Sequence, residues 1–124
     1  MEAGAGTLTR MSEASLDLAL LVVEPSAKSI DVAQRSAAII AEHKIAPTLV
    51  VANRVRDPRD LELIRAALPD REVAVVPEDA AISEADREGR SPVDTAPDSP
   101  GVQAIASLAA RLSAAVATGR HQAV

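Results

Sequence analysis

Three short apolar segments that alternate with helical patterns constrain this fold more than any other feature of the sequence. Residues 18–23 form a continuous apolar run, which is the pattern of a strand covered on both faces in a parallel sheet. Two further strands are predicted from the apolar, valine-rich stretches at residues 48–52 and 72–76. Strands that alternate with helices imply a parallel sheet with right-handed crossovers. The sequence therefore predicts an α/β fold, with a parallel sheet of three or so strands and flanking helices.

Two helices are predicted between these strands. Apolar residues recur at helical spacing over residues 29–43, where alanine-rich filler favours a helix. Asp57 and Pro58 then provide an N-cap and a first-turn proline for a second helix, which ends near Leu68. Both helices follow a strand, so we interpret them as the crossover connections of the parallel sheet.

The last third of the chain is predicted to be largely helical. Gly89 stops a short polar helix over residues 80–88, and a loop with three prolines covers residues 91–100. A long terminal helix with one apolar face follows, and Ser99 or its neighbour is its expected cap. We expect one α/β domain over residues 1–118, with a short helix over residues 7–14, and a flexible tail over residues 119–124.

The composition excludes several classes of function. A net charge of −5 argues against a nucleic-acid or anionic-membrane surface, because both need clustered Lys and Arg. The sequence has no aromatic residue on which a base could stack. It also has no cysteine, so it forms no disulfide or thiolate metal site. No apolar run is long enough to span a bilayer, and we expect a soluble, cytoplasmic protein.

Polar residues follow the second and third predicted strands, and they suggest the base-binding end of a nucleotide site. Ligands of parallel sheets bind beyond the carboxyl ends of the strands. Asn53 could donate to and accept from an adenine edge through its amide, or it could simply form a turn. The turn at Pro77, Glu78 and Asp79 could offer backbone groups to the adenine amino group, or it could cap the next helix through Asp79. Both roles of the turn can hold together.

A phosphate-binding element is missing from the 124 residues, because no glycine-rich loop ends in Lys-Ser or Lys-Thr. Arg54, Arg56 and Arg59 form a local basic run, which could meet a phosphate or an acidic partner but is more typical of a solvated loop. His43 and His121 have no metal-ligand companion at useful spacing. We therefore assign no catalytic residue and no metal ligand.

Four segments of the sequence carry a resemblance to a known family. Residues 1–4 with Glu2, followed by Thr9 and Arg10, resemble a switch region just after a Walker B aspartate, and residues 20–26, followed by Ser29, resemble the next strand and helix start. Residues 50–55, with Asn53 and Arg54, resemble a base-recognition strand. Residues 76–79, with Pro77, Glu78 and Asp79, resemble the final base-flanking turn, and the helix after it is represented by Ile82, Ala85, Asp86, Gly89 and Pro92. In this order the segments resemble the MinD and ParA class of P-loop ATPases (the SIMIBI class), and within it they are most similar to the CooC-like ATPases that assist nickel insertion into carbon monoxide dehydrogenase.

The resemblance implies half of a nucleotide-binding protein. The family's phosphate loop and Walker B carboxylate would lie before Met1, and Glu2 at the terminus is expected to be disordered. ATP is then bound weakly, or only with the missing half, and we expect no Mg²⁺ site and no hydrolysis in this chain alone. The uncovered edge at residues 18–23 implies a homodimer or a partner that supplies the phosphate loop. The alternative is a nonenzymatic α/β regulatory or scaffold module.

Overall fold

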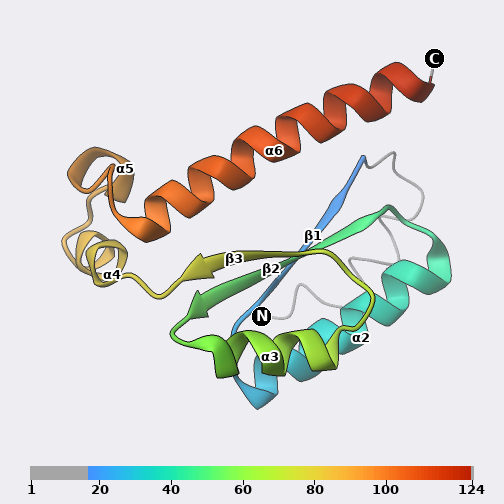
Figure 1. Ribbon diagram of the computed structural model, residues 1–124, viewed down its shortest axis with the longest axis horizontal. Helices are drawn as coiled ribbons and strands as arrows, with labels where there is room; N and C mark the ends of the chain where they lie inside the picture. Colours follow the sequence, from blue (N-terminus) through green and yellow to red (C-terminus); the bar gives the residue numbers. More distant parts are fainter. Residues whose placement is uncertain (1–16, 124) are drawn as a thin grey trace.

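The computed structural model describes residues 17–123, and it places a three-stranded parallel sheet between helices (Figure 1). Its strands lie in the order β1-β2-β3. They are β1 (Ala19–Val23), β2 (Thr48–Val55) and β3 (Val73–Pro77). The helices are α2 (Ala27–His43), α3 (Pro58–Ala67), α4 (Ala80–Arg87), α5 (Pro92–Thr95) and α6 (Pro100–Ala123). The predicted α/β class, with a parallel sheet and flanking helices, is confirmed.

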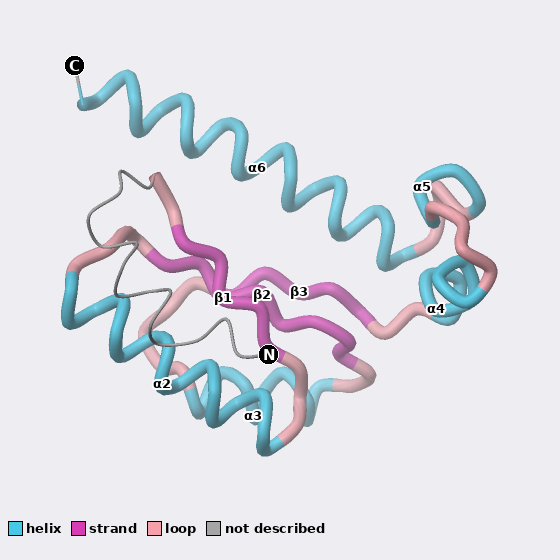
Figure 2. The backbone as a smooth tube through the Cα atoms, turned by 180° about the vertical axis from the view of Figure 1, so that it is seen from behind, coloured by secondary structure: helices cyan, strands magenta, loops and turns pink. Residues whose placement is uncertain are grey.

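The helices cover the two faces of the sheet unequally. Figures 1 and 2 show α2 and α3 on one face and α6 on the other, while α4 and α5 lie beyond the carboxyl end of β3. The main core forms between the sheet and the α2–α3 layer. Ile64, Val23 and Val50 are its largest fully buried side chains. Because the chain has no aromatic residue, branched aliphatic side chains and alanines fill this core.

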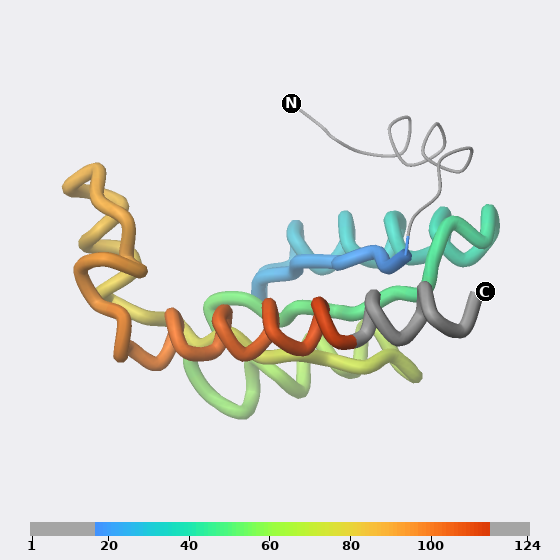
Figure 3. The backbone as a smooth tube through the Cα atoms, turned by 90° about the horizontal axis from the view of Figure 1, so that it is seen from above, coloured from blue at the N-terminus to red at the C-terminus, as the bar shows by residue number. Residues whose placement is uncertain are grey.

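The α6 face leaves β1 exposed. Leu20 pairs with Leu49, and Val22 with Val51, so the four side chains lie on the same face of the sheet. Leu49 and Val51 are buried, whereas Leu20 is 43% exposed and Val22 is 58% exposed. Figure 3 shows α6 running along β3 rather than over β1. The prediction that residues 18–23 form a strand covered on both faces is therefore wrong for the α6 face.

Several element boundaries differ from those predicted. Helix α2 begins at Ala27, two residues before the predicted start, because the Ser26 hydroxyl caps it by accepting a hydrogen bond from the Ser29 N–H. The proline-rich loop contains α5, with Ser91 at its N-cap position and Pro92 in its first turn. Helix α6 runs to Ala123, so His121 lies in this helix and not in the predicted tail. The helix predicted over residues 7–14 and the switch residue Glu2 lie outside the described residues.

Candidate functional site

An open pocket of about 500 Å³ lies at the carboxyl ends of β2 and β3. The five residues predicted to recognise a nucleotide all line it: Asn53, Arg54, Pro77, Glu78 and Asp79. The other lining residues come from β3, from α4 and the segment after it, from α5 and from α6: Val76, Ile82, Ser83, Asp86, Arg90, Pro92 and Ile105. The structure thus brings residues from two strand ends and three helices to one place.

Strand β2 has a bulge at Arg54, the residue that follows Asn53. Asn53 pairs with Val76 and Val55 pairs with Pro77, so Arg54 is left without a partner in the ladder. Arg54 has a φ of 60°, in the left-handed region that non-glycine residues seldom adopt. The Glu78 N–H donates to the Val55 carbonyl oxygen at 2.9 Å, which continues the pairing beyond the bulge. Asn53 therefore lies inside a strand, and not in the turn that was its alternative role.

The side chain of Asn53 makes no hydrogen bond to any residue between 17 and 123, although it is partly buried. An amide carries two donor hydrogens and one acceptor oxygen. The amide is accessible at the pocket wall, so it leaves a donor and an acceptor available for a ligand.

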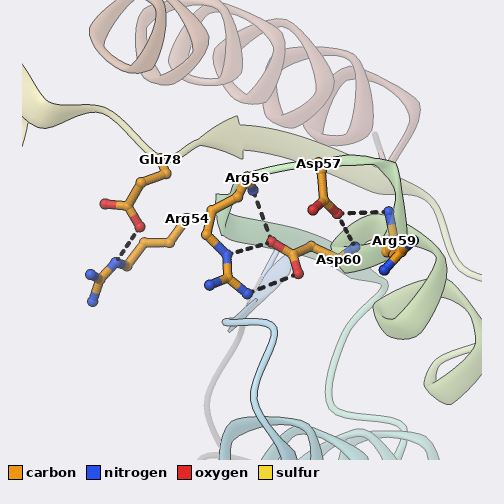
Figure 4. A network of polar contacts seen from close by, with 6 residues as sticks. All are labelled: Arg54, Arg56, Asp57, Arg59, Asp60 and Glu78. Carbon is orange, nitrogen blue, oxygen red and sulfur yellow. Dashed lines mark hydrogen bonds and ion pairs between the residues drawn. The ribbon is translucent and has the colours of Figure 1, made fainter.

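The side chain of Arg54 is held between two carboxylates from different strand ends. Its Nε lies 3.1 Å from Glu78 Oε2, and its Nη1 lies 3.6 Å from Glu24 Oε1 (Figure 4 draws the first of these contacts). The hydrogen bond and charge of Glu78, with a further contribution from Glu24, raise the pKa of Arg54 above its ordinary value. Arg54 is thus a fully charged group that is already paired.

Arg56 is also paired, and its partner is the buried Asp60. The Arg56 Nε and Nη2 donate to the two carboxylate oxygens of Asp60 at 3.0 and 3.2 Å, and the Arg56 backbone N–H donates at 2.9 Å (Figure 4). These hydrogen bonds, the guanidinium ones first, lower the pKa of Asp60. Asp57 caps α3 through the N–H groups of Arg59 and Asp60, as predicted. Arg56 therefore anchors the loop between β2 and α3 to the first turn of α3.

Asp79 has a structural role that spans two helices. Its Oδ1 accepts from the Ala81 N–H at 3.0 Å and caps α4, as the alternative role of the turn predicted. Its Oδ2 accepts from the Gly101 N–H at 2.8 Å, in the first turn of α6. The Gly101 hydrogen bond is the main reason why the pKa of Asp79 is lowered. Ser99, the cap expected from the sequence, accepts from the Gln103 N–H through its backbone carbonyl oxygen.

Comparison with known proteins identifies the fold. No protein-family model and no curated protein matches this sequence. Among solved structures, the MinD cell division protein of Aquifex aeolicus matches with a TM-score of 0.63 and 26% sequence identity, over 79% of this chain and 44% of that chain. The chain has a MinD-type fold. It spans less than half the length of the MinD chain that it matches.

The MinD-type fold confirms the broad part of the resemblance, which is a fold of the MinD and ParA type of ATPase. The closer similarity to carbon monoxide dehydrogenase maturation ATPases stays a prediction. Sequence reasoning missed several pocket residues, among them Ile105 and Arg90. Ile105 lies on the apolar face predicted for the terminal helix, which was a signal for core packing, yet it is 49% exposed at the pocket.

Metal ligands and membrane spans are the remaining features to consider in the described residues. Between residues 17 and 123, no group of three or more His, Cys, Asp and Glu side chains is arranged to hold a metal ion. No helix in the same range is long and apolar enough to cross a membrane. His43 is the last residue of α2, the helix-end position expected for it.

Proposed function

We propose that the pocket binds the adenine base of a nucleotide. The observation that carries this proposal is the unpaired amide of Asn53 on the wall of the pocket. Asn53 can donate to and accept from one edge of adenine at the same time. The backbone of Pro77 and Glu78 is the second source of polar groups, and the MinD-type fold supports a nucleotide as the class of ligand.

The size and lining of the pocket suit a flat base. A volume of about 500 Å³ lies within the range of small-molecule sites. Ile82, Ile105 and Pro92 offer aliphatic surfaces for the faces of the ring. Neutral hydrogen bonds contribute about 0.5 to 1.5 kcal/mol each, so we expect an affinity of roughly millimolar for the base end alone.

The phosphates and Mg²⁺ of a nucleotide are the part that the proposed adenine pocket does not hold. The sequence has no glycine-rich phosphate loop, and Arg54 and Arg56 are already ion-paired. We infer that a different polypeptide, acting as a partner, supplies the phosphate-binding half. In such a complete form the protein would be a metallocentre-maturation or partitioning-type ATPase, and we expect no hydrolysis from this chain alone.

Binding of AMP should perturb the amide resonances of Asn53, Val76 and Glu78 in a two-dimensional NMR titration. Asn53→Ala is expected to weaken that binding about five- to tenfold, because it removes one donor and one acceptor worth about 1 kcal/mol in total. Gln34→Ala is the matched control, because it also removes a side-chain amide, but from α2 and outside the pocket. The proposal fails if millimolar AMP leaves these resonances unchanged, or if both variants bind AMP as the wild type does.

A second candidate function, a nonenzymatic interaction module, is favoured by the exposed strand β1. Between residues 17 and 123, β1 pairs with β2 only, so its outer edge has no strand beside it. Leu20 and Val22 add exposed apolar surface on the same strand. Exposed apolar edges of this kind are templates for pairing with another chain.

Light scattering tests this surface. If the chain associates through β1, Val22→Lys should shift the molar mass toward that of a monomer, because a charge at the edge opposes strand pairing. Leu63→Lys is the control, since Leu63 is 51% exposed on α3, away from that edge. A monomeric wild type with slow amide exchange at Leu20 and Val22 would exclude the β1 interface and leave the nucleotide proposal standing.

A further inference from the structure

Arg54 and Glu78 lie between two hollows at the carboxyl edge of the sheet. Both residues line the 500 Å³ pocket, and both also line a smaller hollow of about 160 Å³. The smaller hollow is completed by residues that follow β1 and β2: Glu24, Pro25, Ser26 and Arg56. The Arg54–Glu78 ion pair therefore forms part of the wall that the two hollows share.

The charges around the two hollows are unfavourable for an anion. Three arginines and four carboxylates line them: Arg54, Arg56 and Arg90 against Glu24, Glu78, Asp79 and Asp86. Each of the arginines also has a carboxylate beside it. Arg56 is held by Asp60, and Arg90 lies 3.8 Å from Glu88. A phosphate that enters this region finds each of the three guanidinium groups already paired.

Arg54 is the arginine that lines both hollows, and it is the one held by two carboxylates. Glu78 holds its Nε at 3.1 Å, whereas Glu24 holds its Nη1 at the longer distance of 3.6 Å. Glu24 is the more exposed of the two carboxylates and comes from the end of β1. The loss of Glu24 would leave one guanidinium with one carboxylate, and it would remove a negative charge beside the smaller hollow.

We propose that this pocket binds uncharged adenosine more tightly than it binds nucleotides with phosphate groups. Glu24 sets this preference by occupying Arg54 together with Glu78. This inference rests on the proposed adenine site. The ligand class is then a nucleoside, or the nucleoside end of a larger molecule whose anionic part is held elsewhere. Glu24 and Arg54 are specificity-determining residues and have no catalytic role.

The physical reason is a Coulomb repulsion that grows with the number of phosphates. Each unit of charge at about 10 Å from a site with one excess carboxylate costs a few tenths of a kcal/mol in water-like surroundings, and salt reduces this further. With the four charges of ATP, the expected preference for adenosine over ATP is about three- to tenfold at low salt. It should shrink as salt is added.

The test compares adenosine, AMP and ATP without Mg²⁺, at matched ionic strength, by NMR titration of the full chain. The wild type should bind adenosine most tightly and ATP most weakly. Glu24→Gln should lower the ATP-to-adenosine ratio of dissociation constants by about threefold or more, with adenosine affinity unchanged. Glu42→Gln makes the same change in net charge near the carboxyl-terminal end of α2 and should keep the wild-type ratio.

The outcomes separate the two proposals. Tighter binding of ATP than of adenosine by the wild type, or the same ratio in the Glu24→Gln and Glu42→Gln variants, overturns the role of Glu24 and leaves the adenine site intact. An absence of binding by all three ligands overturns the adenine site, and this inference with it.

Discussion

Replacement of Ile64 by alanine should lower the free energy of unfolding by about 2 to 5 kcal/mol. Ile64 lies on α3 with no exposed surface, and it belongs to the main core between the sheet and the α2–α3 layer. Removal of its larger aliphatic side chain loses buried apolar surface and leaves a cavity that neighbouring side chains refill only in part. Urea unfolding followed by far-UV circular dichroism measures the change through the transition midpoint.

Leu63→Ala is the matched control for Ile64→Ala. Leu63 is the preceding residue on the same helix and is 51% exposed. The substitution replaces a similar aliphatic side chain with the same helix former, and we expect a change within about 0.5 kcal/mol. Equal effects of the two substitutions would mean that α3 does not pack on the sheet as the structure shows.

The lack of aromatic residues makes this core sensitive to single substitutions. Phe, Tyr and Trp normally bring the largest buried areas to a domain, and none is present here. The largest fully buried side chains are Ile64, Val23 and Val50, and alanines occupy several other core positions. Each branched aliphatic residue therefore contributes a larger share of the buried surface than it would in a core with aromatic residues.

Local sequence signals predicted much of the fold, and they singled out five residues that line one pocket. Asp57 and Pro58 begin α3 as expected, because an N-cap and a first-turn proline act within a few residues. Asn53 and Pro77 meet at one pocket because the carboxyl ends of parallel strands lie along one edge of a sheet. Both inferences need only the order of the elements and their immediate neighbours.

Features that depend on contacts across the sheet were not predictable. The left-handed conformation of Arg54 has no local signal, since glycine or asparagine is the usual residue there. The Arg54 contacts with Glu24 and Glu78 join three strand ends that are distant in the sequence. Short helix α5 was missed although Ser91 and Pro92 form a recognisable start, because the three prolines of the segment favoured a loop.

The link between Asp79 and Gly101 shows how such a distant contact shapes the pocket. A hydrogen bond across 22 positions of the sequence joins the exit of β3 to the first turn of α6. Ile105 lies one turn further along α6 and forms part of the pocket wall. The position of that wall therefore depends on a backbone N–H group at Gly101, which the sequence pattern of an apolar helix face does not reveal.

Gly101→Ala should destabilise the protein by about 1 to 3 kcal/mol, although alanine is the better helix former by about 1 kcal/mol. A Cβ at this position would lie 2.6 Å from Ile82 Cδ1 and 2.9 Å from both Cβ and Oδ2 of Asp79. The Ile82 methyl group can move, but Asp79 is fixed by its cap on α4. The first turn of α6 must therefore shift, and the Gly101 N–H···Asp79 hydrogen bond weakens. Ser107→Ala is the control, because it lies at an exposed position of the same helix and changes helix propensity without a steric overlap. We expect it to leave the stability unchanged or to raise it slightly.

The pH dependence of the Gly101→Ala effect identifies its cause. The hydrogen bond from the Gly101 N–H lowers the pKa of Asp79 in the folded state. This hydrogen bond therefore contributes fully to stability above the ordinary pKa of an aspartate, about 4, and the contribution is lost as the pH falls below that value. The difference between wild type and Gly101→Ala should therefore shrink in urea titrations carried out at progressively lower pH. A difference that stays constant would assign the whole effect to steric overlap.

A shifted α6 also moves Ile105, which forms part of the pocket wall. Gly101→Ala should therefore weaken AMP binding even where the variant is fully folded, and this result would tie the position of α6 to the base pocket.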